Sequence, residues 1–358
     1  MRIVQIIDSL DAGGAERMAV NYANALANKI EFSGLVTTRK EGALKQHLGV
    51  GVKYLFLQKK RQIDIAAIFR LRKYIAKNKI EIIHAHSSSF FIAVLVKLTL
   101  PKIRIIWHDH YGNRTNQSYK ENRVLIFLSV FFSSILVVNL QLEEWSKKYM
   151  KCSQIFFIPN FASINNISNP ITALNGVEGK RIVFLANLKR PKNHILILKA
   201  FLSLNLNELG WSLHLIGKDY YDNYSNVLKD FIESNSLKDH IFLYGEKNDI
   251  SHILSQANIG VLASTDEGFP VTLLEYALHS LPVVSTNVGY CSSVIKNEVT
   301  GLLFNPSSVN EAAEKLNKMI ENVRFRQQMS ESLERFVIEN YSEDVVINKL
   351  VSIYQFSY

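Results

Sequence analysis

The feature that most constrains the fold of this 358-residue chain is a regular alternation of short apolar runs with amphipathic helical patterns. Short apolar runs predict buried strands, and apolar residues that recur every three to four positions predict helices. A first series of strands is expected at 2–7, 32–37, 52–57, 80–84, 103–107, 134–139 and 154–158, and a second at 181–186, 211–216, 240–244, 259–262, 283–285 and 302–304. Alternation of this kind is typical of parallel sheets with helices on both faces.

Two series predict two doubly wound, Rossmann-like domains, because a chain of this length usually exceeds one core. The series are separated by 162–179, which is rich in Asn, Ser, Thr and Gly and is typical of a linker. We assign residues 1–165 to an N-terminal domain, 166–340 to a C-terminal domain and 341–358 to a last helix that can pack back on the N-terminal domain. Ligands of such sheets bind at the carboxyl ends of the strands, so facing domains predict a central cleft.

Net charge and cysteine content indicate the cellular location of the protein. The net charge is +9, and the excess of Lys and Arg lies in the N-terminal domain. Two cysteines, Cys152 and Cys291, are too few for a disulfide framework and fit a reducing, cytoplasmic location. The uncharged run 124–142 resembles a membrane span in length, but its serines and its Ile135–Val138 segment favour a helix followed by a strand.

A strongly basic helix is predicted over 64–79. Its apolar face is marked by Ile65, Ile68, Phe69, Arg72 and Ile75 or Ala76, and basic residues cover most of the rest. The helix can be a solvated surface element, or it can attract anionic lipid headgroups. Nucleic acid is the least favoured partner, because no zinc-finger spacing or aromatic stacking motif accompanies the charge.

Two glutamates bracket the predicted start of a helix in Asp266-Glu267-Gly268-Phe269-Pro270-Val271-Thr272-Leu273-Leu274-Glu275. Pro270 suits the first helical position, so Glu267 is expected in the entry loop and Glu275 about one turn inside. Backbone N–H groups and the helix dipole favour an anion there, while carboxylates suit sugar hydroxyls. The pattern predicts a nucleotide-sugar site, although two unrelated surface acids would look the same.

Other polar residues follow predicted strands. Gly13 and Gly14 open the helix after the first strand, where a backbone can approach an anion closely. His108 and His110 follow the fifth strand, and a histidine there can donate to a sugar hydroxyl or to developing negative charge. Lys189, Arg190 and Lys192 follow the first strand of the second series and can clamp a phosphate.

Little in the sequence supports a metal. Two His-x-His pairs, at 84–86 and 108–110, lack both the helical spacing and the nearby cysteines of common zinc sites. No Asp-x-Asp occurs, so the usual carboxylate pair for a Mg²⁺ or Mn²⁺ diphosphate complex is missing. We predict no metal and no other cofactor, with the diphosphate held by protein cations and helix ends.

Taken in order, these motifs resemble the GT-B glycosyltransferases of the retaining, glycogen-synthase-like family four, the glycosyl transferases group 1. The matching segments, which span nearly the whole chain, are Gly13–Arg17, Ile82–His86, His108-Asp109, Ile158–Asn160, Lys192-Asn193, Glu267–Pro270 with Glu275, Pro282–Val284 and Thr300–Leu302. The resemblance implies metal-independent transfer of a sugar from a nucleotide-diphosphate donor, with retention at the anomeric carbon.

Residue roles follow from the resemblance alone. It implies that Glu267 contacts the donor sugar, Glu275 the ribose, Lys192 and Arg190 the diphosphate, Gly14 the phosphate, and His108 the sugar or reacting centre. Gly13, Asn187 and Pro270 are expected beside the donor, with the amides of Phe269, Val271 and Thr272 at the helix end. The family's usual Gly-Arg-Leu is Ala186-Asn187-Leu188 here, and its Gly-Gly-x-x-Glu becomes Gly289–Ser293 without the acid.

From the resemblance and the basic N-terminal domain we expect a hexosyltransferase on the inner face of the cell membrane. Its partners would be a nucleotide sugar, a saccharide or lipid-linked acceptor in cell-surface polysaccharide biosynthesis (capsule or lipopolysaccharide), and an anionic membrane surface. Two other hypotheses remain, a nucleotide-sugar epimerase on the same fold and a non-catalytic nucleotide-sugar-binding or scaffold protein.

Overall fold

The computed structural model describes residues 1–11, 13–163 and 171–356. The chain divides into two compact units, Met1–Phe161 with Glu343–Tyr358 and Ala162–Ser342. The predicted boundary after residue 165 lies in 164–170, outside the described residues. The chain therefore passes into the second unit and returns to the first at its C-terminal end.

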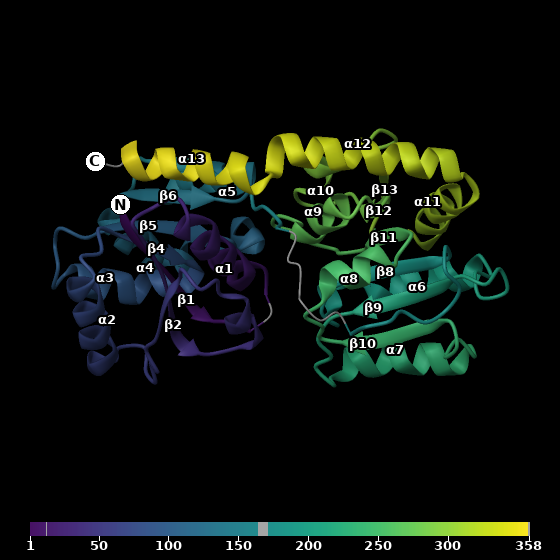
Figure 1. The fold of residues 1–358 in the computed structure, drawn as a ribbon, viewed down its shortest axis with the longest axis horizontal. Coiled ribbons are helices and arrows are strands. Elements are labelled where there is room, and N and C mark those ends of the chain that lie inside the picture. The colour runs from purple at the N-terminus through teal and green to yellow at the C-terminus, as the bar shows by residue number, and fades with distance from the viewer. Residues whose placement is uncertain (12, 164–170, 357–358) are drawn as a thin grey trace. The chain divides into compact units, whose positions relative to one another are not determined.

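The first unit is built on a seven-stranded parallel sheet with the order β3-β2-β1-β4-β5-β6-β7. Figure 1 labels β1, β2, β4, β5 and β6 of this sheet. Its strands are β1 (Arg2–Ser9), β2 (Phe32–Lys40), β3 (Lys53–Phe56), β4 (Ile82–His86), β5 (Arg104–Asp109), β6 (Ser134–Val137) and β7 (Ile155–Phe157). The helices are α1 (Gly14–Ala27), α2 (Ile65–Lys77), α3 (Phe90–Lys97), α4 (Tyr119–Leu128), α5 (Leu140–Tyr149) and α13 (Glu343–Phe356), with short 3-10 turns η1 (Ala43–His47), η2 (Ser87–Ser89), η3 (Gly112–Asn116) and η4 (Ser129–Phe131). Every residue of β4 is buried, as expected for a central strand covered on both faces.

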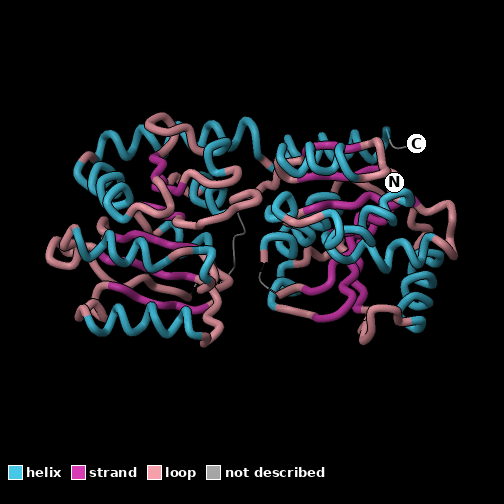
Figure 2. Tube along the Cα trace, turned by 180° about the vertical axis from the view of Figure 1, so that it is seen from behind, coloured by secondary structure: helices cyan, strands magenta, loops and turns pink. Residues whose placement is uncertain are grey.

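The second unit has a six-stranded parallel sheet with the order β10-β9-β8-β11-β12-β13. Its strands are β8 (Arg181–Leu185), β9 (Ser212–Ile216), β10 (Ile241–Gly245), β11 (Ile259–Leu262), β12 (Val283–Thr286) and β13 (Leu302–Phe304). The helical elements are η5 (Arg190–Lys192), α6 (His194–Ser203), α7 (Asn223–Ser234), α8 (Ile250–Ser255), α9 (Val271–Leu278), α10 (Cys291–Val294), α11 (Val309–Glu321) and α12 (Val323–Tyr341). Helices flank the strands of each sheet (Figure 2), so both predicted series of strands and the doubly wound architecture are confirmed.

Each sheet reverses its strand order at one place. In the first unit the reversal lies between β1 and β4, and in the second between β8 and β11. Ligands of doubly wound sheets bind in the crevice at the carboxyl ends of the strands at this switch point. The two places where the fold favours a ligand are thus the segments that follow β1 and β4, and those that follow β8 and β11.

The run 124–142 folds as predicted, because α4 and η4 end at Phe131 and β6 begins at Ser134. Across the described residues, none of the helices combines the length and apolar character that crossing a bilayer requires.

The predicted apolar face of the basic helix is wrong except at Ile75. The buried residues of α2 are Ala67, Leu71 and Ile75, while Ile65 and Phe69 are 67% and 61% exposed. These two apolar side chains thus lie on the surface with the basic residues.

Candidate functional site

The switch point of the second unit brings two predicted residues into direct contact. Lys192 ends η5, in the connection that follows β8, and Glu267 lies in the loop after β11. The Lys192 ammonium nitrogen is 2.5 Å from Glu267 Oε1, and the Ser264 hydroxyl donates to the same oxygen at 2.6 Å. Because the Lys192 side chain is 30% exposed and that of Glu267 only 10%, the pair is shielded on one side and accessible on the other.

The loops that carry this pair are tied together by backbone contacts. The amide of Thr265 donates to the carbonyl of Pro191 at 2.8 Å, and the Thr286 hydroxyl donates to the carbonyl of Ser264 at 2.8 Å. Gly289 has a φ of +50°, and a Cβ at this position would lie 1.7 Å from the carbonyl oxygen of Glu267. Close backbone approach of this kind requires glycine, so the loop after β12 helps to fix Glu267.

The helix beside Glu267 begins one residue later than predicted. Pro270 is the N-cap of α9 rather than its first residue, and the Val271 amide donates to the Phe269 carbonyl at 3.0 Å. This amide is therefore engaged within the loop, which corrects its predicted role at the helix end. Thr272 lies in the first turn of the helix, and its hydroxyl donates to the Leu185 carbonyl at the end of β8 at 3.4 Å.

Packing holds the start of α9 in place. The Phe269 ring is 7% exposed and stacks on Tyr290, with ring centroids 5.1 Å apart, and its edge meets Tyr341 at 5.6 Å. Glu275 lies in the second turn of α9, partly exposed, as the spacing predicts. Phe269 is thus a packing residue that orients the loop.

Arg190 and Asn187 flank the pair on the β8 side. Arg190 opens η5 and is exposed. Its charge opposes the rise that burial causes in the pKa of Tyr224. The Asn187 side-chain oxygen accepts from the Lys218 amide at 2.9 Å, so Asn187 joins the segments that follow β8 and β9.

Gly13 and Gly14 lie at the switch point of the first unit. Gly13 is the N-cap of α1 in extended conformation, and Gly14 is the first helical residue. Among the described residues, no atom lies within 4 Å of a Cβ built on Gly14, whereas one on Gly13 would meet Glu16 Oε2 at 2.3 Å. The space beside Gly14 is therefore open to a ligand group.

His108 lies within the fifth strand and not after it, which corrects its predicted place. β5 continues to Asp109, and His108 pairs with His86 of β4 and Leu136 of β6. Its side chain has no exposed surface. Its ring centroid is 5.6 Å from that of Tyr22 of α1, so the ring lies in a polar cluster on the α1 side of the sheet.

That cluster contains four histidines. His84 Nε2 is 3.1 Å from His108 Nδ1, and His86 Nδ1 is 2.9 Å from His110 Nε2. Burial lowers the pKa of all four rings, to about 3 for His110, so they are neutral near pH 7.

One donor atom each from His84, His86 and His108 lies within 4.8 Å of the others, which is close enough to consider a metal. The rings of His84 and His86, however, stack with centroids 4.4 Å apart and an interplanar angle of 20°. Ligand lone pairs lie in the ring planes, so stacked rings do not converge on one ion. The geometry favours a hydrogen-bonded network, and the expectation that the chain needs no metal stays a prediction.

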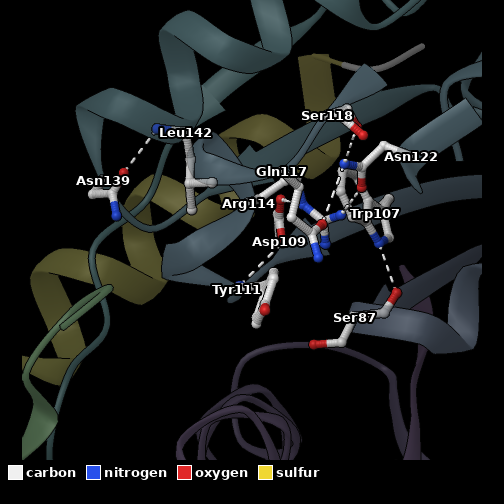
Figure 3. A network of polar contacts seen from close by, with 10 residues as sticks. All are labelled: Ser87, Trp107, Asp109, Tyr111, Arg114, Gln117, Ser118, Asn122, Asn139 and Leu142. Carbon is white, nitrogen blue, oxygen red and sulfur yellow. Dashed lines mark hydrogen bonds and ion pairs between the residues drawn. The ribbon is translucent and has the colours of Figure 1, made fainter. Parts of the chain in front are cut away.

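The opposite face of β5 carries a second network (Figure 3). Asp109 is fully buried and forms two hydrogen bonds with the guanidinium of Arg114 from η3. Arg114 also donates to the Asn122 side chain of α4 at 2.6 Å and lies over the Trp107 ring at 5.3 Å. The pair anchors the connection from β5 to α4 on the strand that carries His108.

Several residues of these sites were missed from the sequence. Ser264 carries a weak signal, since it is a polar residue two positions after the end of β11 and three positions before Glu267. Gly289 is noted only as part of the segment that lacks the family's acid, and nothing in the sequence indicates its contact with the Glu267 carbonyl. Tyr354 lies 270 positions from His84, whose Nδ1 it contacts at 2.6 Å, and no local pattern indicates that contact.

Comparison with known families matches both parts of the chain. Residues 12–165 match the model of Glycosyltransferase Family 4, and residues 172–336 match that of Glycosyl transferases group 1.

Known proteins match nearly the whole length. An uncharacterized glycosyltransferase of Haemophilus influenzae is 25% identical, with 94% of this chain and 95% of the relative covered. UDP-Gal:alpha-D-GlcNAc-diphosphoundecaprenol alpha-1,3-galactosyltransferase of Escherichia coli is 23% identical, with 95% and 93% covered. The crystal structure of Anabaena HepE with UDP-glucose superposes with a TM-score of 0.81 at 16% identity, over 99% and 100% of the two chains. These matches confirm the GT-B fold.

Proposed function

We propose that this chain, which combines a Glycosyltransferase Family 4 domain with a Glycosyl transferases group 1 domain, is a retaining, metal-independent glycosyltransferase with a nucleotide-diphosphate sugar as donor. The observation that carries the proposal is the contact between Lys192 and Glu267 at the switch point of the second unit. Binding of UDP-glucose by the structurally similar HepE supports a donor of this class.

In this pair, the cation and the carboxylate recognise different parts of the donor. Lys192 supplies a cation for the departing diphosphate, which needs stabilisation as negative charge develops. Oε1 of Glu267 accepts hydrogen bonds from Lys192 and Ser264, and a carboxylate has about four lone-pair sites for hydrogen bonds. Its remaining capacity suits the hydroxyls of the donor sugar. Arg190 adds charge for the diphosphate, and Glu275 faces the ribose.

The first unit contributes the amide of Gly14 toward a phosphate and His108 toward the sugar or the reacting centre. The open space beside Gly14 supports the first role. For His108, a buried ring nitrogen that lacks a hydrogen-bond partner among the described residues supports the second. Catalysis then rests on electrostatic stabilisation of the leaving diphosphate, whose oxygen helps to deprotonate the acceptor hydroxyl.

A lipid-linked saccharide is the acceptor that we propose, in the assembly of a cell-surface polysaccharide. The name of the Escherichia coli relative, which acts on a diphosphoundecaprenol-linked sugar, supports this class. The surface of α2 supports it as well. Ile65 and Phe69 are exposed beside the exposed bases Arg72, Lys73 and Lys77, which is a combination suited to an anionic membrane surface.

The test of donor chemistry measures release of nucleoside diphosphate from a panel of sugar nucleotides, in the presence of membranes. Glu267→Gln or Lys192→Ala should lower kcat/KM by about 100-fold or more, as expected for the loss of one electrostatic contact in a transition state. Breaking the exposed pair Lys318–Glu298 with Lys318→Ala is the matched control and should leave activity unchanged.

Unchanged kinetics in both site variants would contradict the assignment. Conversion of one sugar nucleotide into another without an acceptor would indicate an epimerase instead. Activity should persist in excess EDTA, and a loss that Mg²⁺ or Mn²⁺ restores would contradict metal independence.

The membrane proposal predicts that the protein binds vesicles containing phosphatidylglycerol and not neutral vesicles, with binding that weakens as salt rises. The double variant Ile65→Glu/Phe69→Glu should lose most of this binding in a flotation assay. Ile338→Glu on α12, at a residue 48% exposed, is the control. Equal binding of both variants would show that α2 is not the contact.

A further inference from the structure

Two hydrogen-bonded chains cross the polar cluster of the first unit. In one, the Tyr354 hydroxyl of α13 contacts His84 Nδ1 at 2.6 Å, and His84 Nε2 contacts His108 Nδ1 at 3.1 Å. In the other, Gln5 Oε1 contacts His86 Nε2 at 2.8 Å, and His86 Nδ1 contacts His110 Nε2 at 2.9 Å. Each chain therefore ends on a histidine of β5 or directly after it.

In a hydrogen-bonded chain of neutral histidines, the direction of the bond at one end determines which ring nitrogen carries the proton at the other end. A neutral imidazole has one N–H donor and one nitrogen acceptor, so a ring that accepts on one side must donate on the other. All four rings are neutral, as described above, and His84, His86 and His108 are fully buried. The direction of the bond at Tyr354 or at Gln5 thus determines which nitrogen of His108 or His110 carries the proton.

The bond at Gln5 has only one direction, because an amide oxygen accepts. His86 must carry its proton on Nε2, its Nδ1 accepts from His110 Nε2–H, and His110 Nδ1 is left as an acceptor. Tyr354 is the donor of the other chain, because a phenol is a stronger acid than a neutral imidazole N–H. Burial also raises the pKa of Tyr354, so its hydroxyl keeps the proton.

The direction of the Tyr354 bond determines the tautomer of His108 through His84. When Tyr354 donates to His84 Nδ1, the His84 proton lies on Nε2 and is donated to His108 Nδ1. The His108 proton then lies on Nε2. That atom is buried and has no hydrogen-bond partner among the described residues, so its N–H is uncommitted.

We propose that Tyr354 is a positioning residue which holds His108 in the Nε2–H tautomer, so that His108 meets its ligand as a hydrogen-bond donor and not as a base. The ligand group would be an acceptor oxygen, such as a sugar hydroxyl or a diphosphate oxygen. This role rests on the proposed function, whereas the tautomer itself does not.

The chain offers a matched control in Tyr22 of α1. Its ring centroid lies 5.6 Å from those of His84 and His108, so it contacts the same cluster. Its hydroxyl is buried and has no hydrogen-bond partner among the described residues. Tyr22→Phe therefore removes a hydroxyl from the same environment without breaking the chain to His108.

The test is a long-range ¹⁵N–¹H correlation spectrum of the full-length protein labelled at its ten histidines. His108, assigned by His108→Gln, should carry its proton on Nε2 in the unsubstituted protein and in Tyr22→Phe. In Tyr354→Phe the two tautomers should become mixed. A proton on Nδ1 without any substitution, or an unchanged His108 in a folded Tyr354→Phe, would overturn the inference.

A kinetic measurement connects the tautomer with transfer. In Tyr354→Phe, kcat should fall by the same factor as the population of the Nε2–H tautomer, with little change in KM for the donor. In a His108→Gln background, whose amide donates without tautomers, Tyr354→Phe should cause no further fall in kcat. A further fall there would overturn the positioning role. Expected spectra in a protein that releases no nucleoside diphosphate would leave the tautomer standing and reject the proposed function.

Discussion

At the scale of single residues, the position of Glu267 depends on a glycine that makes no side-chain contact. Gly289→Ala places a methyl group where the Glu267 carbonyl oxygen lies, at a residue with a φ of +50°. We expect a folded protein that has lost about 1 kcal/mol or more from backbone strain and about 100-fold in kcat/KM, because a displaced Glu267 no longer holds the donor sugar.

The control is Gly179→Ala. Gly179 has a φ of +86°, and among the described residues no atom lies within 4 Å of the place that a Cβ would take there. It should therefore lose stability through its backbone conformation alone, without losing activity. Thermal unfolding and steady-state kinetics separate the two effects, and equal kinetics in both variants would contradict the role of Gly289.

The residue scale also shows where sequence reasoning ends. Lys192 and Glu267 could be predicted together because each follows a strand at a switch point, and parallel strands bring their carboxyl ends to one edge. The burial of His108 could not be predicted, because the predicted strand ended at residue 107 and the observed strand ends at residue 109. Two residues of extra pairing place His108 inside a buried network, although the sequence placed it in the segment that follows the strand.

At the scale of elements, the connection from β5 to α4 depends on one buried ion pair. The Asp109 side chain has no exposed surface and that of Arg114 only 11%. Burial raises the pKa of Asp109, and Arg114 opposes that rise. Arg114→Met keeps an apolar stem but leaves the carboxylate without its cation, so we expect a loss of about 3–5 kcal/mol in the free energy of unfolding.

Urea unfolding of the single and double variants tests this expectation. Asp109→Asn/Arg114→Met removes both charges and should cost less than Arg114→Met alone, since the uncompensated buried charge is then gone. A double variant at least as unstable as the single one would mean that Arg114 acts by packing on Trp107 and not by charge.

The helix α2 illustrates why element-level patterns can mislead. Ala67, Leu71 and Ile75 are spaced for one clean buried face, yet Ile65 and Phe69 are larger and led the prediction to the wrong side. The periodicity of the sequence predicts a helix with two apolar stripes. It does not show which stripe is buried when the other lies on the surface of the protein. The misplaced face is the one for which we propose membrane contact.

At the scale of the whole molecule, the parallel-sheet architecture was predictable, whereas for the last helix the sequence indicated only that it can pack back on the N-terminal domain. The alternation predicts parallel sheets but not the order of their strands, and α13 belongs to the first unit although α12 before it belongs to the second. Amphipathic spacing predicts that one face of 343–356 is buried. It does not predict which element that face packs against. The contacts of α13 place Tyr354 on His84 and the Arg104 guanidinium on the Tyr354 carbonyl at 3.0 Å, so the C-terminal end completes the first unit.

The buried histidines make the stability of each unit depend on pH. In the first unit four rings have a folded pKa far below the usual 6.5, so between pH 6.5 and the folded values the unfolded chain binds more protons than the folded one. Stability is therefore full above pH 6.5 and falls as the pH drops. From pH 6.5 to 5.5 each ring costs about 1 kcal/mol, or about 4 kcal/mol for the four.

The second unit has two such rings, His194 and His214, with pKa values lowered to about 3 and about 4 mainly by burial, and it should lose about half as much. Trp107 and Trp145 lie in the first unit and Trp211 in the second, so fluorescence of Trp211→Phe reports the first unit alone in urea unfolding. Its transition should move to lower urea as the pH falls from 7.5 to 5.5, and His110→Gln should reduce the loss between pH 6.5 and 5.5 by about 1 kcal/mol. A transition independent of pH would mean that the four rings take up protons in the folded protein as readily as in the unfolded chain, which the hydrogen-bonded chains to Tyr354 and Gln5 do not allow.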